Sequence, residues 1–132
     1  LLARVRAALR MRNLQEKLRL ANEELTKLAV TDPLTNLCNR RHFDQQLEDD
    51  LRRAARFCHP LALISFDLDH FKEINDKFGH AQGDLVLQTF SDLLRHSSRR
   101  IDTVARIGGE EFSAILPATD FEGAQAFAEK VR

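Results

Sequence analysis

Cysteine is scarce in this sequence, and the two copies favour neither a disulfide framework nor a zinc site. Cys38 and Cys58 lie far apart and form no CxxC pair, and the five histidines are scattered, so no zinc-ligand spacing is present. We interpret both cysteines as reduced thiols, which are typical of a cytoplasmic protein.

Long apolar runs and an excess of one sign of charge are missing as well. No apolar run approaches the ~20 residues that a membrane-spanning helix needs, so no membrane span is expected. The 20 basic and 20 acidic residues give a formal net charge of zero, which argues against nucleic acid as a partner bound through bulk charge. A length of 132 residues, 43% of them hydrophobic, suits one soluble domain of ordinary size.

Glycine and proline are absent from residues 1–29, which are rich in good helix formers. We predict a helix that ends at Thr31-Asp32-Pro33, because a residue before proline disfavours the α region. The apolar positions are spaced 3-4-3-4-3, as in the a/d seam of a coiled coil: Met11, Leu14, Leu18, Ala21, Leu25 and Leu28. A helix packed on its own domain is one interpretation. We favour pairing between two copies, because so narrow a stripe covers little of a globular core.

The middle of the chain reads as alternating helices and strands. A turn at residues 36–39, where Asn36 tolerates a positive φ, precedes a helix from about residue 41 to residue 56. Residues 61–69, LALISFDLD, form a short apolar run that is typical of a central strand buried on both faces. A short helix then ends at Gly79, and a second helix runs from Gly83-Asp84 to about residue 96.

The last third of the chain predicts a β-hairpin and a closing helix. Strands at 103–107 and 111–116 join at Gly108-Gly109, and a helix capped by Asp120 follows. A strand–helix–strand crossover makes the first two strands parallel. If the third strand lies between them, it is antiparallel to both. The predicted fold is therefore α/β of the α+β kind: a ferredoxin-like or palm-type antiparallel sheet with helices on its faces, preceded by a coiled-coil helix.

This topology would bring carboxylates from distant parts of the chain together. The turn at Gly108-Gly109 would lie beside the end of the first strand, so Asp67 would meet Glu110 and Glu111, and Asp69 would project to the same side as Asp67. Close carboxylates repel, and a divalent cation such as Mg²⁺ can neutralise them together with phosphate oxygens. Glycines would let a bulky substrate approach the backbone. The plainer alternative is a hairpin turn with solvated acidic residues.

Three separated motifs resemble those of the GGDEF family of diguanylate cyclases, in its GGEEF variant. They are DPLTNLCNRRHF (32–43), FDLDHFKEINDKFGHAQGD (66–84) and RIGGEEF (106–112), in the family's order and spacing. The resemblance covers residues 31–132 and implies the N-terminal portion of a GGDEF domain, because family domains continue further. Residues 1–30 would be a helical linker or coiled coil, and their first half resembles the last helix of a response-regulator receiver domain, as in two-component signalling.

The resemblance implies that two GTP molecules condense to cyclic di-GMP in a homodimer formed through the N-terminal helix, with Mg²⁺ or, in its place, Mn²⁺. Asp67, Glu110 and the Leu68 carbonyl would bind the metal. Glu110 would also be the base for the attacking 3′-hydroxyl, Glu111 would support the metals, and Lys72 would contact phosphate. We expect the isolated 132-residue chain to have little or no turnover.

The resemblance also implies a set of substrate contacts. Asn75 and Asp84 would hydrogen-bond guanine, and the other residues expected at the substrate are His80, Arg106, Gly108 and Gly109, with Arg106 steadying the loop. Taken singly, these residues keep plainer alternatives: Asn75 as a helix C-cap, His80 and Asp84 as a capping pair, and Lys72 as a surface charge.

A second site and a second function follow from the same reading. Arg99 and Asp102 form an RxxD motif ahead of the signature loop, as in family members inhibited by their product, with a surface salt bridge as the alternative. The alternative function is a catalytically silent GGDEF domain that binds GTP or cyclic di-GMP as a signalling receptor. The intact acidic residues argue against it.

Overall fold

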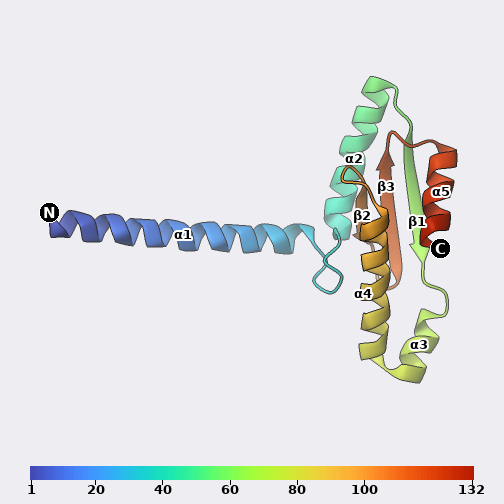
Figure 1. The fold of residues 1–132 in the computed structure, drawn as a ribbon, viewed down its shortest axis with the longest axis horizontal. Coiled ribbons are helices and arrows are strands. Elements are labelled where there is room, and N and C mark those ends of the chain that lie inside the picture. The colour runs from blue at the N-terminus through green and yellow to red at the C-terminus, as the bar shows by residue number, and fades with distance from the viewer. The chain divides into compact units, whose positions relative to one another are not determined.

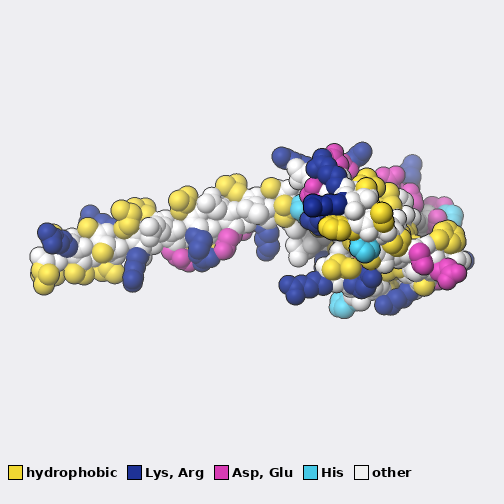
Figure 2. Space-filling model, turned by 90° about the horizontal axis from the view of Figure 1, so that it is seen from above, with side chains coloured by type: hydrophobic (Ala, Val, Ile, Leu, Met, Phe, Trp, Pro, Cys, Tyr) yellow, Lys and Arg dark blue, Asp and Glu magenta, His cyan; other side chains and the backbone are white.

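The computed structural model describes residues 1–132 without a gap and divides into two compact units, residues 1–30 and residues 31–132 (Figure 1). The first unit is the helix α1 (Leu2–Val30), which buries none of its side chains. Leu14, Leu18, Leu25 and Leu28 of the seam are 62–64% exposed, and Figure 2 shows hydrophobic side chains at the surface along this helix. Nothing within the unit covers the seam. None of the helices combines the length and hydropathy needed to cross a bilayer.

The second unit contains a three-stranded sheet in the order β1–β3–β2. The central strand β3 (Glu111–Pro117) is antiparallel to both β1 (Leu61–Asp67) and β2 (Thr103–Arg106). The predicted α+β fold and the central place of the third strand are confirmed. The prediction that the first strand is central and buried on both faces is wrong, because β1 lies at an edge of the sheet and its Leu63 is 53% exposed. An apolar run does not by itself distinguish a central strand from an edge strand.

Helices cover both faces of the sheet. They are α2 (Arg40–Phe57), α3 (Phe71–Phe78), α4 (His80–Ser97) and α5 (Phe121–Val131). Ile115 of β3 packs in a cluster with Phe43 of α2. Phe112 of the same strand packs in the main cluster with residues of α4 and α5, and its ring meets Phe90 edge to face at 4.9 Å. The period-two alternation of β3 therefore divides the core into two layers.

Several turn and cap residues adopt the conformations that their chemistry predicts. Asn36 has a φ of 56°. Asp120 caps α5 by accepting a hydrogen bond from the Gly123 N–H at 2.9 Å. Both cysteines are free, and burial raises the pKa of the Cys38 thiol, which keeps this thiol protonated.

The boundary between α3 and α4 differs from the prediction. Helix α4 begins at His80, not at Gly83-Asp84, and Gly79 alone separates the two helices. Gly79 has φ 89° and ψ 163°, a conformation that is essentially restricted to glycine. The chain therefore turns at Gly79, and Gly83 lies within the first turn of α4.

Candidate active site

The C-terminal end of β1 and the N-terminal end of β3 lie side by side. Asp67 is paired with Glu111 in the antiparallel register, and the Leu68 N–H donates a hydrogen bond to the Glu110 carbonyl at 3.3 Å. Directly paired residues of neighbouring strands project to the same face. Asp67, Glu110 and Glu111 are thus brought to one end of the sheet.

The protein does not neutralise these three carboxylates. Neither Lys72 nor Arg106 forms a salt bridge with them, and the Arg106 guanidinium pairs instead with Asp32. Like charges directly opposite each other in a sheet are destabilising, so Asp67 and Glu111 gain nothing from each other. This end of the sheet consequently carries an acidic charge that a cation can offset.

Asp69 does not belong to β1, which ends at Asp67. The extended-strand argument that set Asp69 beside Asp67 therefore does not apply. Both residues nevertheless line a hollow of about 540 Å³, together with Leu68 and residues of α4 and α5. Space for a ligand thus opens directly beside the end of β1.

The donor atoms at this end suit one kind of metal site. No group of three or more His, Cys, Asp or Glu side chains is arranged to hold a metal ion on its own. Mg²⁺, however, usually takes only one or two carboxylates and completes its shell with water and substrate phosphates. Two carboxylates and a backbone carbonyl are hard oxygen donors that fit a magnesium ion arriving with a nucleotide, rather than a preformed metal centre.

Arg106 holds the turn that precedes β3. Its Nε donates to the Gly108 and Gly109 carbonyls at 3.2 Å each, and its Nη2 donates to the Gly109 carbonyl at 2.9 Å. The Nη1 group reaches Asp32 at 3.3 Å. Gly109 has open space where a Cβ would stand, whereas a Cβ on Gly108 would lie 3.2 Å from the Glu111 carboxylate. The guanidinium thus fixes two carbonyls of the turn, and the glycine at its tip leaves the backbone accessible.

Helices α3 and α4 follow β1 and carry the other predicted contacts. Asn75 is not the C-cap of α3, because Gly79 occupies that position and donates its N–H to the Asn75 carbonyl at 2.8 Å. His80 and Asp84 are not a capping pair, because the N-terminus of α4 has no side-chain cap. The Asn75 Oδ1 is buried and has no hydrogen-bond partner. These plainer roles for Asn75, His80 and Asp84 are therefore excluded.

Arg99 and Asp102 of the RxxD motif form an ion pair at 2.9 Å. The Asp102 carboxylate is 1% exposed and also accepts the Arg99 backbone N–H at 2.7 Å. Arg99 is about half exposed and additionally donates to the Pro117 carbonyl and to Thr119. Asp102 thus holds Arg99 in place, and Arg99 is the member of the pair that a ligand can reach.

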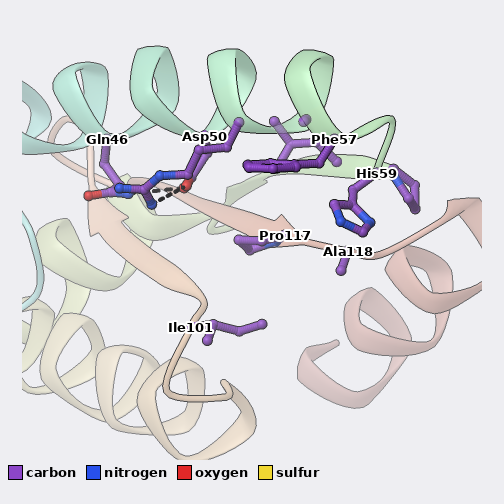
Figure 3. Close-up of a pocket in the computed structure, with 11 residues that line it drawn as sticks. Gln46, Asp50, Phe57, His59, Ile101, Pro117 and Ala118 are labelled. Carbon is purple, nitrogen blue, oxygen red and sulfur yellow. Dashed lines mark hydrogen bonds and ion pairs between the residues drawn. The ribbon is translucent and has the colours of Figure 1, made fainter.

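A separate hollow of about 360 Å³ lies at the other end of β1 and β3 and contains none of the predicted site residues (Figure 3). Its walls include Phe57, His59 and Pro117. The buried Asp50 carboxylate in it already accepts hydrogen bonds from Gln46 at 3.1 Å and Arg53 at 3.3 Å. The carboxylate in this hollow is therefore satisfied by the protein, and the hollow has no cluster of unpaired carboxylates like that at the acidic end of the sheet.

Comparison with known families decides what kind of domain this is. A family profile described as "Diguanylate cyclase, GGDEF domain" matches residues 29–132. The chain belongs to the GGDEF family. The GGDEF chain is 44% identical over 110 residues to the diguanylate cyclase DgcP of Pseudomonas aeruginosa, covering 83% of this chain and 16% of DgcP. It is 41% identical over 130 residues to the response regulator PleD of Caulobacter vibrioides, covering 98% of this chain and 29% of PleD.

A solved GGDEF structure agrees with the fold. The coiled coil and GGDEF domain of DgcB from Caulobacter crescentus, determined in complex with c-di-GMP, matches with a TM-score of 0.89 at 32% identity. The match covers 97% of this chain and 68% of the DgcB chain. The chain therefore spans less than a third of each of the two curated relatives and about two thirds of this solved neighbour.

Sequence reasoning missed two contacts of the GGDEF site. Arg106 was expected to steady the loop, but its partner Asp32, which is 74 residues away, was not identified. The contact of Asn75 with Gly83 across the two helices was missed as well. Asp32 and Arg106 lie in different motifs, whereas Asn75 and Gly83 share one motif but lie on two different helices. In neither case does a single sequence contain a signal for the contact.

Proposed function

We propose that this GGDEF domain is part of a diguanylate cyclase, which condenses two GTP molecules into cyclic di-GMP with release of two pyrophosphates. The observation that carries the proposal is the pairing of β1 with β3, which brings Asp67, Glu110 and Glu111 to one end of the sheet. The similarity to DgcP, a protein named as a diguanylate cyclase, supports the same reaction. A purely structural module would leave this uncompensated acidic cluster unexplained.

The proposed chemistry is a double nucleotidyl transfer. In each of two steps, the 3′-hydroxyl oxygen of one GTP forms a bond to the α-phosphorus of the other. The bond from this α-phosphorus to the oxygen that bridges the α- and β-phosphates breaks, and pyrophosphate leaves with the electron pair of that bond. We assign the hydroxyl proton to the Glu110 carboxylate, which acts as general base. Lys72 would contact phosphate.

Other residues of the site would bind and orient the reactants. Asn75 and Asp84 would read guanine, with His80 beside them, and the Gly108-Gly109 backbone would leave room for the substrate. A divalent metal, for which Mg²⁺ fits the donors, would be held by Asp67, Glu110 and the Leu68 carbonyl with Glu111 in support, and would offset charge on the phosphates.

The proposed reaction needs two copies, since each domain would hold one GTP. We propose that α1 pairs through its exposed seam in a homodimer and thereby raises the effective concentration of one GTP-loaded domain near the other. The similarity to PleD covers nearly the whole chain, α1 included, and supports an upstream receiver domain.

Replacement of Glu110 tests the reaction. In the intact protein with GTP and Mg²⁺, we expect Glu110→Ala to lower cyclic di-GMP synthesis at least about 100-fold, the low end of a general base's contribution. The matched control is Glu48→Ala, which removes an exposed glutamate of α2 that pairs only with Arg52. Equal synthesis by Glu110→Ala would refute the assigned role. Tight binding of GTP or cyclic di-GMP by the wild type without synthesis would instead favour the silent receptor.

Product inhibition would act through Arg99. The guanidinium is accessible and held by a buried carboxylate, which suits recognition of a phosphate or a guanine edge. We expect Arg99→Ala to weaken inhibition by added cyclic di-GMP at least tenfold while GTP turnover persists. Unchanged inhibition in a folded Arg99→Ala protein would leave the pair as a structural salt bridge only.

A further inference from the structure

The side chain of Asn75 on α3 packs against Gly83 of α4, in space that a Cβ at position 83 would need. A Cβ built on Gly83 would lie 1.8 Å from Asn75 Oδ1 and 2.9 Å from Asn75 Cγ. Real side chains essentially never approach so closely, so the Asn75 amide occupies the space that any other residue at position 83 would fill. The same Asn75 Oδ1 is the buried side-chain oxygen without a hydrogen-bond partner.

We propose that Gly83 is a positioning residue, which fixes the orientation of the Asn75 amide and thereby sets the selectivity of the site for guanine. The inference rests on the proposed function, in which Asn75 reads the base. Gly83 itself would not touch the nucleotide. Its role is to leave vacant the volume into which the amide turns.

The backbone does not explain why glycine stands at position 83. Gly83 lies within α4, does not have a positive φ, and donates its N–H to the Gly79 carbonyl at 3.2 Å. At such a helical position alanine is energetically more favourable than glycine. The obstacles to a side chain are the Asn75 amide and, less severely, the Phe71 ring at 3.2 Å. The contact with Asn75 is therefore the main reason for glycine.

The unpartnered Asn75 Oδ1 indicates that the orientation of this amide does not serve the stability of the fold. Buried polar atoms are almost always hydrogen-bonded, and the exceptions need an explanation. The orientation of this amide leaves Oδ1 without a hydrogen-bond partner within the protein. A ligand with both donors and acceptors on one edge, such as guanine, would make use of an amide held in a fixed orientation.

The distance between α3 and α4 at Gly83 also affects where Asp84 lies relative to Asn75. Gly79 alone connects α3 to α4, and Asp84 directly follows Gly83. A side chain at position 83 would displace the Asn75 amide, or widen the helix pair, or both. Each of these changes alters the position of Asn75 relative to Asp84, the two residues proposed to read guanine.

Four variants of the intact protein test the inference: Gly83→Ala, Asn75→Ala, the double variant, and Gly123→Ala as the matched control. Gly123 also lies in the first turn of a helix and would carry a crowded Cβ, at 2.9 Å from Thr119 Cγ2, but in α5. The measurement is the dissociation constant for GTP and for ATP, each as its α,β-methylene analogue, which cannot release pyrophosphate, by titration calorimetry with Mg²⁺. We expect Gly83→Ala to weaken GTP binding at least tenfold and ATP binding hardly at all, and Gly123→Ala to keep the wild-type preference.

The double variant separates positioning from a general effect on packing. If Gly83 acts through Asn75, the double variant should bind GTP no more weakly than Asn75→Ala alone. Losses that add in the double variant, or a folded Gly83→Ala protein with wild-type preference for GTP, would overturn the inference. Should Gly83→Ala fail to fold, recovery of folding in the double variant supports the shared volume, and failure of both contradicts it.

The outcomes also separate this inference from the proposed function. A wild-type protein that prefers GTP to ATP but makes no cyclic di-GMP would defeat the proposed reaction and leave the role of Gly83 intact. Conversely, synthesis by the wild type with unchanged nucleotide preference in Gly83→Ala would defeat the inference alone.

Discussion

Asp32 joins the start of the domain to the turn before β3. Its carboxylate accepts hydrogen bonds from the Thr35 hydroxyl at 2.8 Å, from the Thr35 N–H at 2.9 Å and from Arg106 at 3.3 Å. Burial alone would raise the pKa of Asp32, but the bonds from Thr35 and the charge of Arg106 outweigh burial and lower this pKa. Folding therefore favours the ionised form of Asp32. The Arg106 guanidinium that pairs with Asp32 also donates hydrogen bonds to the Gly108 and Gly109 carbonyls.

Replacing Asp32 should change stability in a pH-dependent way. We expect Asp32→Asn to lower the free energy of unfolding at pH 7 by about 1–2 kcal/mol, because hydrogen bonds to a charged group are lost. A carboxyl whose pKa is lowered on folding stabilises the fold above its unfolded pKa, and this contribution disappears as the pH falls through the folded pKa. The difference in free energy of unfolding between the wild type and Asp32→Asn should therefore be largest at pH 7 and should shrink below about pH 4.

Urea titrations at pH 7 and at steps below pH 4 measure this gap. Asp44→Asn, at an exposed aspartate of α2, serves as the control and should change stability little at any pH. A gap of the same size at every pH would show that Asp32 acts through its shape and not through its charge.

Among the secondary-structure elements, the α3–α4 pair departs most from what its sequence predicts. The sequence pattern predicts that Gly83 begins a helix, but Gly83 lies inside α4. Glycine stands at this position because Asn75 packs where a Cβ would be. Gly79, predicted only as the end of α3, makes the whole connection. Sequence patterns identify both glycines but do not say which of them turns the chain, since that depends on contacts between helices.

The sheet shows the same division between local and long-range information. Strand and helix types follow from local periodicity, and Asp120 is legible as a cap because its bond to Gly123 spans three residues. The edge position of β1 is set by its pairing with β3, about 50 residues away, which local composition does not encode. The acidic end was predictable once the third strand was placed between the first two, because that arrangement sets the turn before β3 beside the end of β1. The Arg106–Asp32 pair was not predictable in this way.

Gly79 should be sensitive to substitution through its backbone alone. We expect Gly79→Ala to lower the free energy of unfolding by roughly 1–3 kcal/mol, because φ 89° and ψ 163° are strained for any residue with a Cβ. No atom lies within 4 Å of the added Cβ, so a clash does not contribute. Gly109→Ala is the matched control for stability, with equally open space and no positive φ. Equal unfolding curves for the two variants would contradict the assignment of strain to Gly79.

At the scale of the whole molecule, α1 forms a compact unit of its own, residues 1–30. None of its residues is buried, although its seam leucines are large and apolar. The ion pairs of Arg19 with Glu16 and Glu23 lie off the seam, and pairs of this kind support an exposed helix by a few tenths of a kcal/mol each. A helix of 29 residues with an uncovered a/d stripe would gain most of its stabilisation from the partner helix that we propose.

The seam should control synthesis of cyclic di-GMP without controlling the binding of GTP. We expect Leu18→Glu, on the seam, to make the protein monomeric at micromolar concentration and to lower cyclase activity at least tenfold, because the two GTP-loaded domains then meet only by diffusion. GTP affinity per domain should be unchanged, since α1 belongs to a separate compact unit. Leu20→Glu is the matched control, because Leu20 is a leucine of similar exposure that lies off the seam. Light scattering reports the oligomeric state, and a monomeric Leu18→Glu protein with wild-type activity would show that dimerisation through α1 is not what brings the two substrates together.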